Sequence, residues 1–257
     1  MARVIDFNSD LGESFGAYKL GDDEAILAAV TSANIACGYH AGDPAVMRRT
    51  LALCKERSVA PGAHPGYPDL LGFGRRAMAV SPDDVYNYVL YQLGALNGLA
   101  VAAGMRLQHV KPHGALYNQA EIDMRLAEAI AAAVKTFDPE LILLVPANSA
   151  MAAAGRTAGL RVAAEVFADR AYTPEGRLVD RRLPGALITD PQEAAARVVE
   201  MVERGTVTAV DGSKLTIAAD SVCVHGDSPT AVSFAVAVRQ ALSERGIAIR
   251  PLREWLR

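Results

Sequence analysis

The sequence predicts an α/β fold, a variant (β/α) barrel of about seven strands. Short apolar runs alternate with segments of helical length, and polar side chains follow nearly every run. The alternation indicates a parallel sheet. Polar residues at the carboxyl ends of many strands are typical of a barrel's active face, whereas an open sheet concentrates them near one switch point. We therefore expect residues 1–257 to form a single catalytic α/β barrel domain.

Seven apolar runs are the predicted strands. They cover residues 4–7, 33–37, 59–63, 107–111, 141–145, 162–166 and 222–224. Residues 206–217 form two further β-rich arms around Asp211-Gly212, a pair that favours tight turns. We expect this segment to be a β-hairpin added to the main sheet.

Four helix starts carry a capping side chain followed by proline, which is favoured at the first helical position. They are Asp43-Pro44, Ser81-Pro82, Asp190-Pro191 and Ser228-Pro229. The second of these helices is predicted to end near Ala103. Gly94 and Gly98 lie inside it and leave two interpretations open, close helix packing or a break, because glycine costs roughly 1 kcal/mol relative to alanine there.

The composition describes an ordinary globular chain, with 51% hydrophobic and 21% charged residues. A formal net charge of -3 argues against nucleic acid or an anionic membrane as a partner. The amino-terminal residues lack the apolar core of a signal peptide, and no apolar stretch reaches the length of a membrane span. The three cysteines, Cys37, Cys54 and Cys223, fit reduced thiols. We expect a cytoplasmic protein.

The exit of the first strand gathers oxygen-bearing side chains. Successive strand side chains alternate between faces, so Asp6, Asn8 and Asp10 point the same way, and Glu13 follows a glycine. Buried carboxylates need partners, which favours a metal, a proton-transfer site or a cationic ligand. A solvated polar turn is the alternative interpretation.

Four of the five histidines follow other predicted strands: His40, His64, His113 and His225. Imidazoles with a carboxylate suit zinc, manganese or a similar divalent metal, so Asp10 with His40 or His64 is a candidate metal site. These ligands would come from separate strands, and the presence of a metal stays open.

A metal-free interpretation uses the same groups. Asp10 or Glu13 would remove a proton from water, while Lys111, His113 or His64 polarises a carbonyl. Arg75-Arg76, after the glycine-rich residues 72–74, would bind a carboxylate or phosphate, although adjacent arginines are often only a solvated surface. Neither a P-loop nor a Rossmann glycine fingerprint is present.

Together the strand exits resemble the LamB/YcsF family, also called the family of 5-oxoprolinase A subunits. The matching motifs cover residues 6–16, 33–44, 62–69, 72–76, 110–118, 165–172 and 223–227. They span nearly the whole chain. Ser9 departs from the pattern, since cysteine is expected there in many relatives.

The resemblance implies a barrel related to the glycoside hydrolase and deacetylase types. It also implies ATP-dependent opening of the lactam 5-oxo-L-proline to L-glutamate, with partner subunits B and C. ATP would bind this chain or a partner. Phosphate transfer to the amide oxygen would drive the opening of a resonance-stabilised lactam and leave its carbon more electrophilic.

The resemblance also gives the candidate residues roles. Asp10 and Glu13 would prepare water or bind the ring nitrogen. His64, Lys111 and His113 would stabilise the oxyanion, and Arg75 or Arg76 would anchor a carboxylate or phosphate. The other expected substrate-binding residues are Asn8, His40, Tyr117, Asp169, Arg170 and His225. Two other classes stay open: a stand-alone metal-dependent amidohydrolase or sugar deacetylase, and a non-catalytic binding or scaffold subunit.

Overall fold

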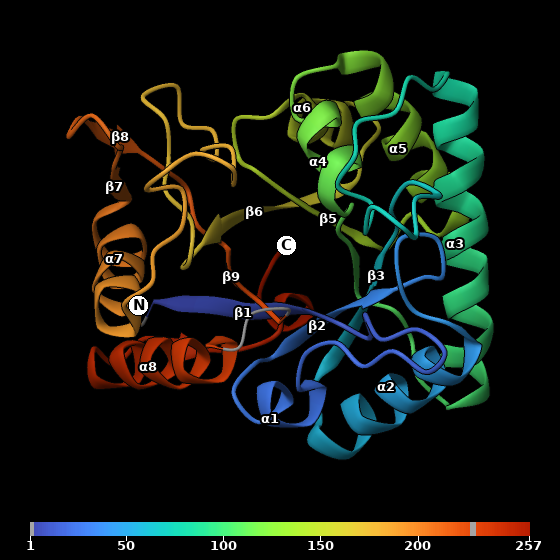
Figure 1. Ribbon diagram of the computed structural model, residues 1–257, viewed down its shortest axis with the longest axis horizontal. Helices are drawn as coiled ribbons and strands as arrows, with labels where there is room; N and C mark the ends of the chain where they lie inside the picture. Colours follow the sequence, from blue (N-terminus) through green and yellow to red (C-terminus); the bar gives the residue numbers. More distant parts are fainter. Residues whose placement is uncertain (1–2, 227–229) are drawn as a thin grey trace.

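A closed barrel of parallel strands forms the centre of the computed structural model, which describes residues 3–226 and 230–257 (Figure 1). Its strands are β1 (Val4–Leu11), β2 (Ser32–Ala36), β3 (Ala60–His64), β4 (His109–Val110), β5 (Ile142–Val145), β6 (Arg161–Phe167) and β9 (Ser221–His225). They pair in this order, and β9 also pairs with β1, which closes the barrel. The seven predicted strands and the variant (β/α) barrel are confirmed.

Helices connect the strands and surround the barrel (Figure 1). They are α1 (Asp23–Leu27), α2 (Pro44–Arg57), α3 (Pro82–Ala102), α4 (Gly114–Ala120), α5 (Met124–Phe137), α6 (Ala150–Thr157), α7 (Pro191–Arg204) and α8 (Ala231–Glu244). The short strand β10 (Ala248–Ile249) pairs with the start of β1, and the 3-10 helix η1 (Leu252–Glu254) follows it. Within the described segments, none of the helices combines the length and hydrophobicity needed to cross a bilayer.

The helix starts follow the predicted capping pattern. Asp43 and Asp190 accept hydrogen bonds from the first free backbone N–H groups of α2 and α7, and Ser81 forms a capping box with Asp84 at the start of α3. Three predicted starts are therefore confirmed. The fourth, Ser228-Pro229, and Asp227 of the last motif lie outside the described residues.

Gly94 and Gly98 lie on the exposed side of α3, and the helix continues through both of them. A Cβ atom added to either glycine would meet no atom of the described residues within 4 Å. Neither open interpretation, close helix packing or a break, therefore applies.

The predicted hairpin is present as an antiparallel pair, β7 (Thr206–Thr208) and β8 (Lys214–Thr216). Residues 209–213 connect the two strands, so the connection is longer than the two-residue turn that Asp211-Gly212 suggests. The pair forms a two-stranded sheet of its own beside the barrel.

The interior of the barrel is polar, because the inward-facing positions of β1 carry Asp6, Asn8 and Asp10. All three side chains are buried, as the alternation predicts. The intervening apolar residues, such as Ile5 and Phe7, join the large hydrophobic core. The polar turn is thereby excluded as the explanation of this stretch, and each carboxylate must find a partner inside the protein.

Asp6 lies deepest and is expected to make stability depend on pH. Burial raises the pKa of Asp6 from 3.8 to about 6, although hydroxyl groups of Ser221, Ser32 and Thr31 favour its ionised form. A group whose pKa is higher in the folded state contributes stability that is complete below its unfolded pKa and is lost as the pH rises through its folded pKa. At 1.36 kcal/mol per pKa unit, the loss is about 3 kcal/mol.

Replacing Asp6 by asparagine should remove this contribution. Between about pH 3 and about pH 7, the difference in unfolding free energy between Asp6→Asn and the wild type should move by about 3 kcal/mol in favour of the variant. The remaining titrating groups are common to both proteins and largely cancel in the difference, which urea unfolding measures at each pH. A difference that stays constant with pH contradicts the expectation.

Candidate active site

Lys111, which follows β4, joins two buried carboxylates at the carboxyl end of the barrel. Its Nζ atom lies 2.8 Å from Asp10 Oδ1 and 2.8 Å from Glu165 Oε1. It also lies 3.0 Å from Cys223 Sγ. Burial opposes the charge of Lys111, but Asp10, Cys223 and Glu165 raise its pKa well above the usual value. The lysine therefore stays a cation in the interior.

Asp10 is held as a carboxylate. Burial opposes its ionisation, but its interactions with His64 and Lys111 keep the pKa of Asp10 well below its usual value. Its Oδ1 atom also accepts a 2.7 Å hydrogen bond from Asn34, and its Oδ2 atom lies 3.5 Å from His64 Nε2. An ionised, fixed carboxylate can orient a water molecule or accept a hydrogen bond from an amide N–H.

Glu165 of β6 completes this network and was not among the residues predicted for the site. Burial raises the pKa of Glu165, and Lys111 opposes that rise. Tyr117, a predicted substrate-binding residue, donates its hydroxyl to Glu165 Oε2 at 2.9 Å. The signal that could have found Glu165 is a single carboxylate inside an otherwise apolar strand, because such a group must be paired.

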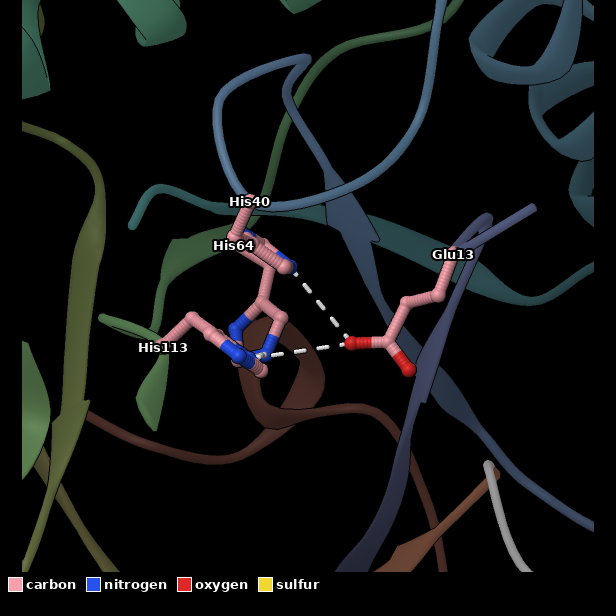
Figure 2. Close-up of side chains that lie close together, drawn as sticks. All are labelled: Glu13, His40, His64 and His113. Atoms are coloured by element: carbon pink, nitrogen blue, oxygen red, sulfur yellow. Dashed lines mark hydrogen bonds and ion pairs between the residues drawn. The ribbon is translucent and has the colours of Figure 1, made fainter. Parts of the chain in front are cut away.

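Glu13, His40, His64 and His113 meet at the same end of the barrel, and we call them the histidine cluster (Figure 2). Glu13 Oε1 lies 3.5 Å from His40 Nε2 and 3.7 Å from His113 Nδ1. The rings of His40 and His113 stack with centroids 3.7 Å apart. His113 Nδ1 lies 2.9 Å from His64 Nε2.

Two backbone carbonyls orient the histidine cluster. His64 Nδ1 lies 2.7 Å from the carbonyl oxygen of Lys111, and His113 Nε2 lies 2.8 Å from that of Phe73. Gly74 allows the loop at Phe73 to come this close, because its φ is +62° and a Cβ atom there would lie 2.7 Å from His40 Cβ. Burial lowers the pKa values of His40 and His113 well below the usual value.

A cavity of about 820 Å³ opens onto both groups of residues. Asp10, His64, Lys111, His113 and His225 line its floor. Its arginines are Arg75, Arg76, Arg170, Arg177, Arg181 and Arg182. Their charges favour an anionic ligand, and guanidinium groups match carboxylate and phosphate geometry.

The predicted substrate-binding residues fall into different environments. Arg76 forms an ion pair with Asp69, and Arg75 lies over the Phe73 ring, 4.8 Å from its centroid. His225 Nδ1 lies 2.7 Å from Asp169 Oδ2. Both arginines and the histidine still line the cavity while they make these contacts.

Two other predicted residues are held by the protein itself. Arg170 is buried, donates to the carbonyl of Val179 and lines the cavity. Burial lowers the pKa of Arg170 to about 10. Asn8 lies inside the barrel, where its amide donates to Ser221 Oγ and accepts from Asn34. A positioning role beneath Asp10 suits Asn8 better than contact with a ligand.

The candidate metal ligands are grouped differently from the predicted set. His40 and His64 lie with Glu13 and His113, whereas Asp10 lies with Cys223 and His225. Lys111 contacts both Asp10 and Cys223, so its ammonium group already provides a positive charge to the group formed by Asp10, Cys223 and His225. The fifth histidine, His109, lies deeper in the barrel, where its Nε2 atom is 2.6 Å from Asn34 Oδ1.

The chain is similar to proteins of one family along its whole length. The model of the LamB/YcsF family matches residues 5–257. Two relatives described as A subunits of 5-oxoprolinase come from Methylococcus capsulatus, 57% identical over 100% of this chain and 98% of the relative, and Bacillus subtilis, 54% identical over 97% of each.

Solved structures show the same relationship. A lactam utilization protein from Thermus thermophilus is 50% identical, with a TM-score of 0.92 over 96% of this chain and 99% of the other. A family 4 carbohydrate esterase from Streptomyces lividans shares the fold, with a TM-score of 0.52 and 11% identity over 97% of this chain and 93% of the other. The chain belongs to the LamB/YcsF family, alongside relatives described as 5-oxoprolinase A subunits.

Proposed function

We propose that this chain opens the lactam 5-oxo-L-proline to L-glutamate in an ATP-dependent reaction, as the A subunit of a 5-oxoprolinase with partner subunits B and C. The names of its relatives support the substrate class and a multi-subunit enzyme. The observation that carries the proposal is the buried Asp10–Lys111–Glu165 network, in which Asp10 and Lys111 line the floor of an arginine-lined cavity.

The network suits amide hydrolysis because the reaction places negative charge on the amide oxygen. A fixed, buried cation stabilises such a charge more strongly than water does, and Lys111 is such a cation. Asp10 orients the attacking water or accepts a hydrogen bond from the ring N–H. Tyr117 and Glu165 position Lys111, because Glu165 contacts both of them. His64 and His113 line the same cavity on the side of the histidine cluster.

ATP makes the amide reactive. Transfer of its terminal phosphoryl group to the lactam oxygen releases ADP and turns the resonance-stabilised amide into an imidate ester. Water then adds to the ring carbon, and the C–N bond breaks as the nitrogen takes up a proton, which gives γ-glutamyl phosphate. A second water hydrolyses this acyl phosphate to glutamate and phosphate. The arginines of the cavity wall suit both the substrate carboxylate and a phosphate group. The volume of the cavity, about 820 Å³, lies within the range for small-molecule sites.

The test is a reconstituted assay of glutamate formation from 5-oxoproline, with and without ATP and with and without subunits B and C. We expect glutamate only when ATP and both partners are present, with ADP formed alongside it. Hydrolysis of an N-acetyl sugar by the isolated chain without ATP would contradict the proposal and favour a deacetylase. Glutamate formation that survives substitution of every strand-exit residue of this chain would favour a scaffold role.

A further inference from the structure

We propose that the histidine cluster binds one divalent transition-metal cation. The inference goes beyond lactam opening and does not rest on it, because it concerns binding by the chain alone. Four side chains that are common metal ligands offer donor atoms within 4.8 Å of one another, and all four are buried. Three further observations point to a cation between them.

The first observation is the hydrogen-bond pattern of His64 and His113. A carbonyl oxygen only accepts, so His64 Nδ1 and His113 Nε2 must both carry hydrogen to bond the carbonyls of Lys111 and Phe73. In a neutral imidazole the other nitrogen then has only a lone pair. The two remaining nitrogens face each other at 2.9 Å, which places two acceptors together. A cation between them resolves this conflict.

The second observation is His40, which is completely buried. Neither of its ring nitrogens has a hydrogen-bond partner among the described residues. Buried polar atoms nearly always have a partner, so this imidazole has an unmet requirement. Its Nε2 atom faces Glu13 Oε1 at 3.5 Å (Figure 2), so a cation between these two atoms would contact both of them.

The third observation is the spacing of the donors. The measured separations from Glu13 Oε1 are 3.5 Å to His40 Nε2 and 3.7 Å to His113 Nδ1. A tetrahedral ion with metal–ligand bonds of about 2.0–2.1 Å places its ligand atoms about 3.4 Å apart. The rings of His40 and His113 are now stacked and parallel, so one of them must rotate for both in-plane lone pairs to reach the same four-coordinate ion.

The chemistry of the surroundings agrees. Histidine ligands of metals usually donate their second ring N–H to a carbonyl or carboxylate, as His64 and His113 do here. Imidazoles with one carboxylate suit zinc, manganese, iron or cobalt. His64 and His113 line the cavity, which provides a route from solvent. A bound ion would supply Lewis-acid polarisation of a carbonyl oxygen or of water at the cavity floor.

The test uses the full-length chain without an affinity tag, freed of metal by a chelator and titrated with Zn²⁺, Mn²⁺ or Co²⁺ in a calorimeter. We expect one ion per chain. Glu13→Gln and His40→Gln should each weaken binding by at least about 100-fold, since even outer-shell changes cost 10–100-fold. His225→Gln is the matched control, because it removes a histidine from the other group and should leave binding unchanged.

Either of two titration results would overturn the proposal. One is a wild-type chain that binds no ion of the three, which would assign a shared proton to the pair His64–His113. The other is binding that depends on His225 and not on His40. If a variant fails to fold, the absorption spectrum of the wild-type Co²⁺ complex decides. A thiolate charge-transfer band would place the ion at Cys223 and contradict the proposal, whereas ligand-field bands without it support nitrogen and oxygen ligands.

Discussion

Replacing Lys111 by methionine is expected to lower the free energy of unfolding by about 3–5 kcal/mol near neutral pH, because removing one partner of a buried ion pair leaves an uncompensated charge. Lys111 is only 2% exposed, and it contacts both Asp10 and Glu165. Methionine has a similar length and volume, so the packing is largely kept. The change in unfolding free energy therefore measures mainly the loss of the Lys111 charge. Urea unfolding at about pH 7.5 measures it.

The pH dependence of this deficit identifies its cause. Without the lysine, the folded pKa values of Asp10 and Glu165 rise, and protonation of these carboxylates removes the unpaired charge. The deficit should therefore shrink as the pH falls. Lys135→Met is the control, because Lys135 is exposed and its ammonium group donates a hydrogen bond to the carbonyl of Gly159. It should change stability by less than about 0.5 kcal/mol. A Lys111→Met protein as stable as the wild type would contradict the charge network.

Replacing Asp10 by asparagine should lower the kcat of glutamate formation by at least about 100-fold, the usual contribution of an acid–base group. The fold should survive, because asparagine keeps the size of the side chain and Lys111 keeps Glu165 as its partner. Initial rates over a range of 5-oxoproline concentrations separate kcat from KM. They are measured in the complex with subunits B and C.

Asp190→Asn provides the matched control for this variant. Asp190 is exposed and caps α7, and asparagine caps a helix equally well. The charge change is the same in both variants, yet Asp190→Asn should leave the rate unchanged. An Asp10→Asn complex with the wild-type kcat would remove Asp10 from the reaction.

The strands of the barrel could be predicted from the sequence because each one is marked by a short local pattern of apolar and polar residues. Alternation along β1 placed Asp6, Asn8 and Asp10 on one face, and apolar runs located all seven strands. The alternation of strands and helices in the sequence does not show whether the sheet closes into a barrel. The evidence for closure was the polar residues after nearly every strand, which an open sheet does not need.

Local sequence patterns could not predict which of the site residues contact one another. Asp10 and Glu13 are close in sequence, yet Asp10 contacts Lys111 whereas Glu13 faces His40 and His113. Gly12, with a φ of +68°, lies between them, and the connections after β2 and β4 bring His40 and His113 to Glu13. Glu165 escaped prediction because its apolar neighbours suggested only a buried strand.

The cavity wall shows the same limit. Arg75-Arg76 could be assigned to anion binding from residue type alone, but the ion pair of Arg76 with Asp69 depends on the fold of the intervening loop. Arg177, Arg181 and Arg182 follow β6 by ten or more residues and gave no signal in the sequence, yet they line the cavity. Long connections bring such residues to a site, and their course is set by packing.

The most direct test of the central claim is a structure of the complex of this chain with subunits B and C, determined with 5-oxoproline and without ATP. The lactam should lie on the floor of the arginine-lined cavity, with its carbonyl oxygen within hydrogen-bond reach of Lys111 Nζ and its ring beside Asp10. A lactam bound within one of the two partners, with this cavity free of it, would contradict the claim that the polar end of the barrel is the hydrolytic site.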